Sequence, residues 1–103
     1  MPAALAHGDR DGVLVVSGDL DMATAGDLGS RLERAIAGQA AVVVVDTSGV
    51  SFVDCSGLRP LLAAEERLSA HGRHLHLVAP SASVLRLLRW AGTEGVFGLP
   101  ARA

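Results

Sequence analysis

The residues best suited to chemistry lie together in the segment Asp54-Cys55-Ser56-Gly57, which places a carboxylate, the only thiol and a hydroxyl side by side. Asp54 suits a helix N-cap, where a carboxylate accepts hydrogen bonds from free backbone N–H groups. Cys55 and Ser56 then fall where the helix dipole favours negative charge, so this position can host a phosphate on a side chain. Gly57 allows a partner backbone to approach closely.

Pro60 affects where the helix after this segment can begin. Proline fits the first helical turn and disfavours helical geometry in the residue before it. We therefore expect regular helix to start only at about Gly57 to Arg59, which leaves Cys55 and Ser56 in an exposed lead-in.

A second polar segment, Gly18 to Thr24, follows the β-branched run Val13 to Val16. The polar stretch Asp46 to Ser51 likewise follows the apolar run Ala41 to Val45, and we expect it to be a loop. In α/β sheets, functional loops lie beyond the carboxyl ends of strands. If the two strands are neighbours, the two polar segments meet at one end of the molecule.

Length and composition narrow the functional classes. The 103 residues fit a single domain, 1–103, and half of them are hydrophobic. The net charge of -2 and the lack of a basic tract argue against a nucleic-acid partner. A lone cysteine cannot form an internal disulfide, no apolar run is long enough to span a bilayer, and no signal peptide is visible. We expect a cytoplasmic protein without membrane insertion, cofactor or metal.

Hydrophobic periodicity predicts an α/β fold, with a mixed β-sheet and packed helices in the order β-β-α-β-α-β-α-(β). Thr24 and Asp27 have the spacing of a capping box. The uninterrupted apolar run at 41–45 favours a central strand covered on both faces. The expected elements are a hairpin with strands at 4–8 and 13–16, turning at 9–12; a helix from Thr24 to Gly38; the central strand; a helix ending at His71-Gly72; a strand at 74–78; a helix from Pro80-Ser81 to Gly92; and an optional strand at 96–99.

The segment from Asp46 to Leu58, with Ser-Gly-Val followed by an apolar pair and Asp-Cys-Ser-Gly-Leu, resembles the signature of STAS domains, specifically of stand-alone anti-sigma factor antagonists. Gly18-Asp19-Leu20-Asp21, followed by Thr24, is similar to a second segment of that family. The order of elements also matches over nearly the whole chain. The resemblance implies a STAS-like sheet and a binding protein, with no catalytic residues and no small-molecule substrate.

The resemblance further implies partner switching. The partner is an anti-sigma factor with a histidine-kinase-like ATPase fold, which releases its sigma factor when the antagonist binds and phosphorylates a serine of the antagonist to end the interaction. A phosphate adds nearly two negative charges beside existing carboxylates, which repels a close-fitting partner. The residues implied in partner binding are Asp19, Asp21, Thr24, Ser48, Asp54, Cys55, Ser56, Gly57 and Arg59.

The chain departs from the family pattern at the phosphoacceptor position, which is occupied by Cys55. A kinase that phosphorylates serine does not readily phosphorylate a thiol. Three interpretations follow, in order of preference: a constitutively active antagonist, an antagonist with Ser56 as the acceptor, and one in which Cys55 reports redox state.

Other functions remain open from the sequence. The same domain occurs as a subunit of transport or other signalling complexes. An enzyme with Cys55 as nucleophile would need a nearby histidine base, and none is adjacent in sequence. His74 and His76 would share one face of a strand, but solvated histidines are favoured over a metal site. Arg86, Arg89 and Trp90 could form a partner surface, although a solvated helix face with a partly buried Trp90 is the preferred interpretation.

Overall fold

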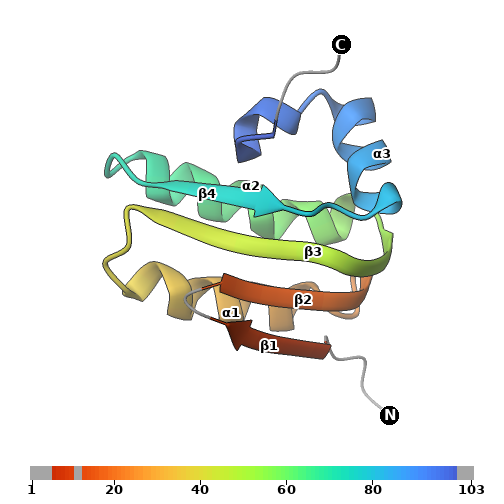
Figure 1. Cartoon of the computed structure of the whole chain (residues 1–103), viewed down its shortest axis with the longest axis horizontal. Helices are drawn as coiled ribbons and strands as arrows, with labels where there is room; N and C mark the ends of the chain where they lie inside the picture. Colours follow the sequence, from red (N-terminus) through yellow and green to blue (C-terminus); the bar gives the residue numbers. More distant parts are fainter. Residues whose placement is uncertain (1–5, 11–12, 100–103) are drawn as a thin grey trace.

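A mixed four-stranded β-sheet in the order β1-β2-β3-β4 organises the molecule in the computed structural model, which describes residues 6–10 and 13–99 (Figure 1). β1 pairs antiparallel with β2, whereas β2, β3 and β4 run parallel. The predicted α/β class with a mixed sheet is therefore confirmed. The elements are β1 (Ala6–Arg10), β2 (Val13–Leu20), α1 (Ala25–Ala37), β3 (Val42–Val53), α2 (Cys55–Ser69), β4 (His74–Val78), α3 (Ala82–Ala91) and the 3-10 helix η1 (Glu94–Phe97).

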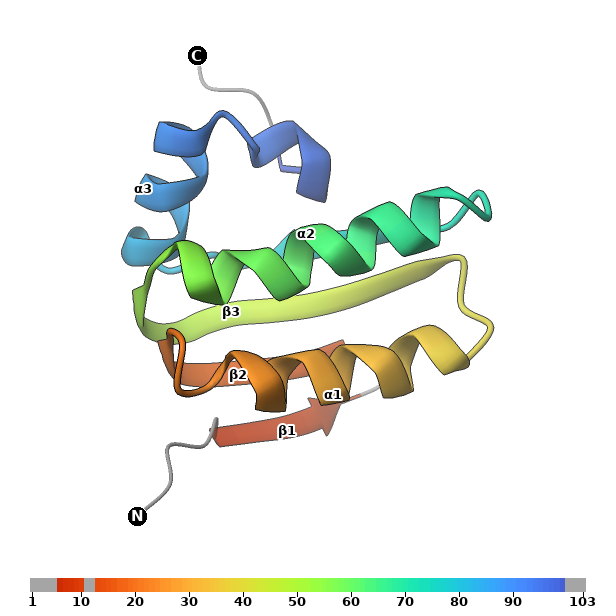
Figure 2. The same cartoon turned by 180° about the vertical axis from the view of Figure 1, so that it is seen from behind.

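Helices α1 and α2 connect the parallel strands and lie side by side on one face of the sheet (Figures 1 and 2). Parallel neighbours need such crossovers, and the right-handed twist of strands places successive crossovers on the same face. The core fills the space between this face and the two helices. Its fully buried members include Val16, Leu20, Leu28, Leu32, Val45, Leu61, Leu68, Leu75 and Leu77.

The apolar run of β3 is central in the sheet, but the expectation that both of its faces are covered was wrong. Val43 and Val45 are buried against α1 and α2, whereas Val42, which points to the other face, is 38% exposed. Among the described residues the two crossover helices cover only one face of the sheet. The valines fit this strand because β-branched side chains suit a pleated surface, even where it is partly solvated.

β3 continues through residues that were expected to form a loop. Asp46 to Ser51 belong to the strand, which ends only at Val53. The pairing with β2 is maintained across this stretch by two register shifts, so that Gly49 lies opposite Ser17 and Phe52 opposite Asp19. β-Bulges of this kind allow polar and glycine residues to remain in a ladder.

β2 is also longer than predicted, because Gly18, Asp19 and Leu20 extend it. Gly18 has a φ of +91°, which a residue with a side chain rarely adopts, and it stands next to one of the register shifts. The first hairpin is confirmed as an antiparallel pair, but its first strand, β1, includes Asp9 and Arg10, which were assigned to the turn. Of the predicted strand and turn, residues 4, 5, 11 and 12 lie outside the described residues.

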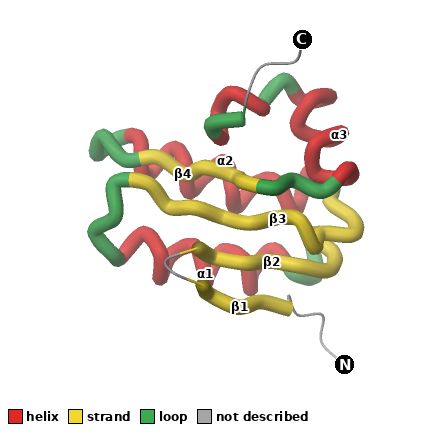
Figure 3. The backbone as a smooth tube through the Cα atoms, in the orientation of Figure 1, coloured by secondary structure: helices red, strands yellow, loops and turns green. Residues whose placement is uncertain are grey.

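Helix α3 and η1 lie beyond the β4 edge of the sheet, as the colour-coded trace in Figure 3 also shows. Ser81 caps α3 by accepting a hydrogen bond from the Val84 N–H, and Gly92 ends the helix at a φ of +69°, as its sequence position predicted. No strand forms at 96–99. These residues belong instead to η1 and its end, where Phe97 is completely buried and completes the core.

Candidate functional site

The polar segments that follow β2 and β3 meet at one end of the molecule, as the sequence predicted. The backbone N–H of Asp54 donates a hydrogen bond of 3.1 Å to the carbonyl oxygen of Leu20. This bond joins the last residue of β2 to the residue that links β3 to α2. The neighbouring parallel strands thus fix the relative position of both segments.

Asp54 is the N-cap of α2, as predicted. Its Oδ1 accepts a hydrogen bond of 3.2 Å from the N–H of Gly57, and its carbonyl accepts one of 3.0 Å from Leu58. The helix therefore begins at Cys55, and the expectation of a start at Gly57 to Arg59 was wrong. Pro60 lies inside the helix, where it lacks an N–H donor for the Ser56 carbonyl and its ring crowds that carbonyl.

Gly57 is required by the protein's own packing. It is buried, and a Cβ placed on it would lie 2.3 Å from the Leu20 oxygen and 2.7 Å from the Leu20 Cβ. Those contacts are shorter than side-chain atoms tolerate. The close approach between the start of α2 and the end of β2 therefore depends on glycine at this position.

The segment between β2 and α1 is held by Asp21 and Thr24. The Asp21 Oδ1 accepts a hydrogen bond of 2.9 Å from the N–H of Ala23, which closes a tight turn. The Thr24 hydroxyl donates to the Asp19 carbonyl at 2.7 Å and accepts from the Asp21 N–H at 3.0 Å.

This arrangement excludes the predicted capping box. Thr24 is the N-cap of α1, but its side chain makes no capping bond because the hydroxyl is used within the preceding turn. Asp27 pairs instead with Arg31 at 3.3 Å. Thr24 is only 3% exposed, so it shapes the segment and offers almost no surface to a partner.

The exposed part of this end of the molecule consists of Cys55, Ser56 and the surface beside them. Cys55 is exposed in the first turn of α2, and Ser56 is half-buried. Ser56 borders a shallow groove of about 360 Å³ between the start of α1 and the start of α2. Met22, at 80% exposure, forms one side of it. The groove is lined by Met22, Ala25, Ser56, Arg59, Pro60 and Ala63.

The structure brings most of the predicted binding residues to this end, but not all of them. Asp19 is exposed at the end of β2, and Arg59 is exposed on α2. Ser48 is exposed in the middle of β3, roughly 20 Å of strand away from Asp54. Ser48 is therefore separate from the surface around Cys55.

Two exposed aromatic residues near this end were not among the predicted binding residues. Phe52 is 50% exposed at the end of β3, and Trp90 is 79% exposed on α3. The expectation that Trp90 is partly buried was therefore largely wrong. The signal was present in the sequence, because Val84 and Leu88 define the buried side of α3 and Trp90 does not share their helical spacing.

The histidines around β4, His71, His74 and His76, lie away from Cys55. His74 pairs in register with Val42 at the start of β3, whereas Cys55 follows the end of that strand. His74 and His76 stack with ring centroids 6.5 Å apart, as expected for one face of a strand. Within residues 6–10 and 13–99, no group of three or more metal-ligating side chains is found.

His71, His74 and His76 therefore cannot supply the base that a Cys55 nucleophile would need.

Within residues 6–10 and 13–99, no helix is both long and apolar enough to cross a bilayer.

Comparison with known proteins places this arrangement in a family. The family model described as "Mlab, STAS domain" matches residues 3–100. An anti-sigma factor antagonist from Mycobacterium paratuberculosis is similar in structure, with a TM-score of 0.76, 31% identity, and coverage of 95% of this chain and 85% of that one. The unphosphorylated anti-sigma factor antagonist SpoIIAA shares the fold at 20% identity, with a TM-score of 0.70 and coverage of 89% and 84%. No curated protein matches the chain. The chain belongs to the STAS domain family.

Proposed function

We propose that this protein is an anti-sigma factor antagonist that docks an anti-sigma factor on the surface around Asp54, Cys55 and Ser56. The observation that carries the proposal is that the segments after β2 and β3 are joined at one end of the molecule and leave Cys55 exposed at the start of α2. Similarity to the mycobacterial antagonist over 95% of the chain supports the same role.

The proposed partner is an anti-sigma factor with a histidine-kinase-like ATPase fold. The docking surface contains Asp19, Asp21, Cys55, Ser56 and Arg59, with Asp54, Gly57 and Thr24 holding it in shape. The groove beside Ser56 adds an apolar area around the exposed Met22. A surface that combines an apolar centre with charged residues at its margin is typical of protein–protein recognition. Ser48 is not included, because it lies in the middle of β3.

Cys55 sets the form of regulation that we propose. It occupies the position at which the family carries its phosphoserine, and a thiol is not a substrate for a serine kinase. We propose that the protein is a constitutively active antagonist. Two other forms of regulation compete with this one. In the first, the exposed Cys55 is redox-sensitive, and in the second, the half-buried Ser56 is the phosphoacceptor.

A reconstituted release assay tests the function. A complex of the kinase-like anti-sigma factor and its sigma factor from the same organism is titrated with this protein and followed by size-exclusion chromatography. We expect free sigma factor to appear together with a complex of the anti-sigma factor and this protein, in the presence of ATP. A sigma factor that stays bound at saturating protein contradicts the proposal. Co-purification with transporter subunits instead would favour the alternative role.

A further inference from the structure

A groove beside the docking surface is formed where the end of β3 meets α3. It has a volume of about 300 Å³. Phe52 and Val53 line it from β3, directly before Asp54, and Asp19 lies opposite Phe52 in the sheet. Two residues that line the groove thus come directly before the segment that carries Asp54 and Cys55. Its lining residues are Phe52, Val53, Ser83, Arg86, Leu87 and Trp90.

The walls of this groove are fixed relative to each other. The Ser83 hydroxyl donates a hydrogen bond of 3.0 Å to the Ser51 carbonyl, and the Ser81 N–H donates to the Thr47 carbonyl at 3.3 Å. Both bonds tie the first turn of α3 to β3. A groove between fixed elements loses little conformational entropy when a partner binds.

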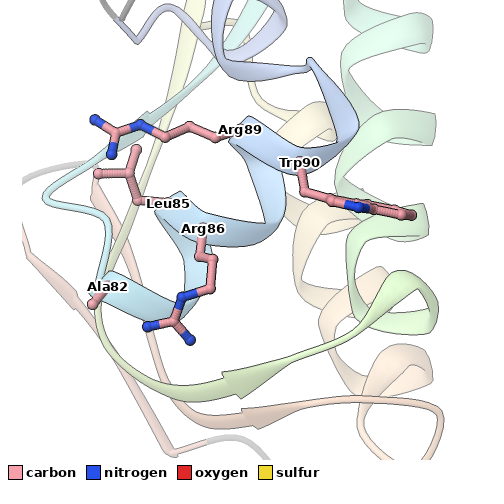
Figure 4. Close-up of a pocket in the computed structure, with 5 residues that line it drawn as sticks. All are labelled: Ala82, Leu85, Arg86, Arg89 and Trp90. Carbon is pink, nitrogen blue, oxygen red and sulfur yellow. The ribbon is translucent and has the colours of Figure 1, made fainter.

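Trp90 and Arg86 dominate the exposed surface of α3. They also line a second hollow of about 480 Å³ on the outer side of the helix, together with Ala82, Leu85 and Arg89 (Figure 4). In Figure 4 the side chains of Trp90 and Arg89 leave α3 on opposite sides. Tryptophan and arginine are the residue types that most often dominate binding energy in protein interfaces.

The charge of the groove indicates what it binds. Arg86 is exposed, and no carboxylate among residues 6–10 and 13–99 lies within ion-pair distance of it. Arg89 has only a long contact of 4.0 Å with Glu94. Among the residues that the structure describes, no acidic side chain lines the groove. An arginine without an internal partner, beside an exposed indole, complements a carboxylate that neighbours an apolar side chain.

We propose that the groove formed by Phe52, Arg86 and Trp90 binds an acidic, apolar segment of the anti-sigma factor, as a second contact beside the Cys55 surface. This inference rests on the proposed function. The apolar side chain of the segment fills the space between Phe52 and Trp90, and its carboxylate pairs with Arg86. The contact does not involve the phosphoacceptor position, so it contributes affinity that is independent of the state of residue 55.

Two variants test the groove, and two more serve as controls, in binding to the purified kinase-like anti-sigma factor by isothermal titration calorimetry. Arg86→Glu and Trp90→Ala alter exposed side chains and are expected to fold normally. Each is expected to weaken binding about tenfold or more. The matched control is Arg34→Glu, an exposed arginine in the last turn of α1, which is expected to bind as the wild type does. Binding of Arg86→Glu and Trp90→Ala at wild-type strength, with Cys55→Asp impaired, overturns the groove contact and leaves the proposed function standing.

If the wild type binds no such anti-sigma factor, the proposed function is wrong, and the segment that binds the groove cannot come from that protein. Trp90 is the only tryptophan, so its fluorescence then tests the groove directly. A tryptophan-free amphipathic peptide of leucine and glutamate should shift the emission to shorter wavelength, and the same peptide with glutamine should not. Equal responses, or none, contradict carboxylate recognition. An emission that depends on protein concentration alone would show that a second copy covers the groove, which also overturns the proposal.

Discussion

The N–H of Asp54 donates a hydrogen bond of 3.1 Å to the carbonyl of Leu20, and the same carbonyl oxygen leaves no room for a side chain on Gly57. The end of β2 is therefore in contact with both the cap and the first turn of α2. This contact fixes the first turn of α2 against the end of β2. The position of the exposed Cys55 is fixed with it, because Cys55 belongs to that turn.

Gly57→Ala is expected to destabilise the protein by about 2 kcal/mol or more, because the new methyl group would overlap the backbone of Leu20. The free energy of unfolding in urea measures the effect. Gly29→Ala is the matched control in α1, where an added Cβ meets no atom within 4 Å, and alanine there should stabilise the helix by about 1 kcal/mol. Equal effects of the two substitutions would contradict the packing described for Gly57.

Two threonine-to-valine substitutions should differ in their effects on stability. Thr24→Val removes a buried hydroxyl that bonds the Asp19 carbonyl and the Asp21 N–H, which should cost about 1–3 kcal/mol. The hydroxyl of Thr47 is completely buried and has no hydrogen-bond partner in the described part of the chain, so Thr47→Val should be neutral or stabilising. Thermal unfolding of both variants checks this difference, and a destabilised Thr47→Val would show that its hydroxyl has a role.

Asp54→Asn separates the capping role of Asp54 from its charge. Asparagine caps helices as well as aspartate does, so stability should change by less than about 0.5 kcal/mol, whereas Asp54→Ala should lose about 1 kcal/mol. If the carboxylate also contacts the anti-sigma factor, Asp54→Asn should bind it about tenfold more weakly. Unchanged affinity for a stable Asp54→Asn would assign Asp54 a purely structural role.

Cys55→Ser should create a phosphoacceptor. Incubated with the kinase-like anti-sigma factor and ATP, Cys55→Ser should gain one phosphate in its intact mass, whereas the wild type should gain none. The serine would stand at the start of α2, where free N–H groups favour a phosphate. Phosphorylation of the wild type that disappears in Ser56→Ala would instead identify Ser56 as the acceptor.

The sequence predicted the order of the elements and the meeting of the two polar segments, because periodicity, caps and β-branched runs are local signals. It did not predict that β3 continues from Asp46 to Val53, since that depends on pairing with β2 through register shifts. The helical start at Cys55 was not predicted, because Pro60 disfavours helical geometry at Arg59, whereas the contact that holds the first turn against Leu20 is distant in sequence. The packing role of Gly57 was likewise not predicted, because the Leu20 backbone that fills its side-chain space is distant in sequence.

The most direct test of the docking surface is the affinity of Cys55→Asp for the purified kinase-like anti-sigma factor. Aspartate in the first turn of a helix is favourable, so the variant should fold and present a negative charge at the proposed phosphoacceptor position. Gln39→Asp, exposed in the loop between α1 and β3 at the opposite end of the sheet, is the control for the added charge. We predict tight binding by the wild type and Gln39→Asp and loss of binding by Cys55→Asp. Equal binding by all three proteins would contradict docking at this surface.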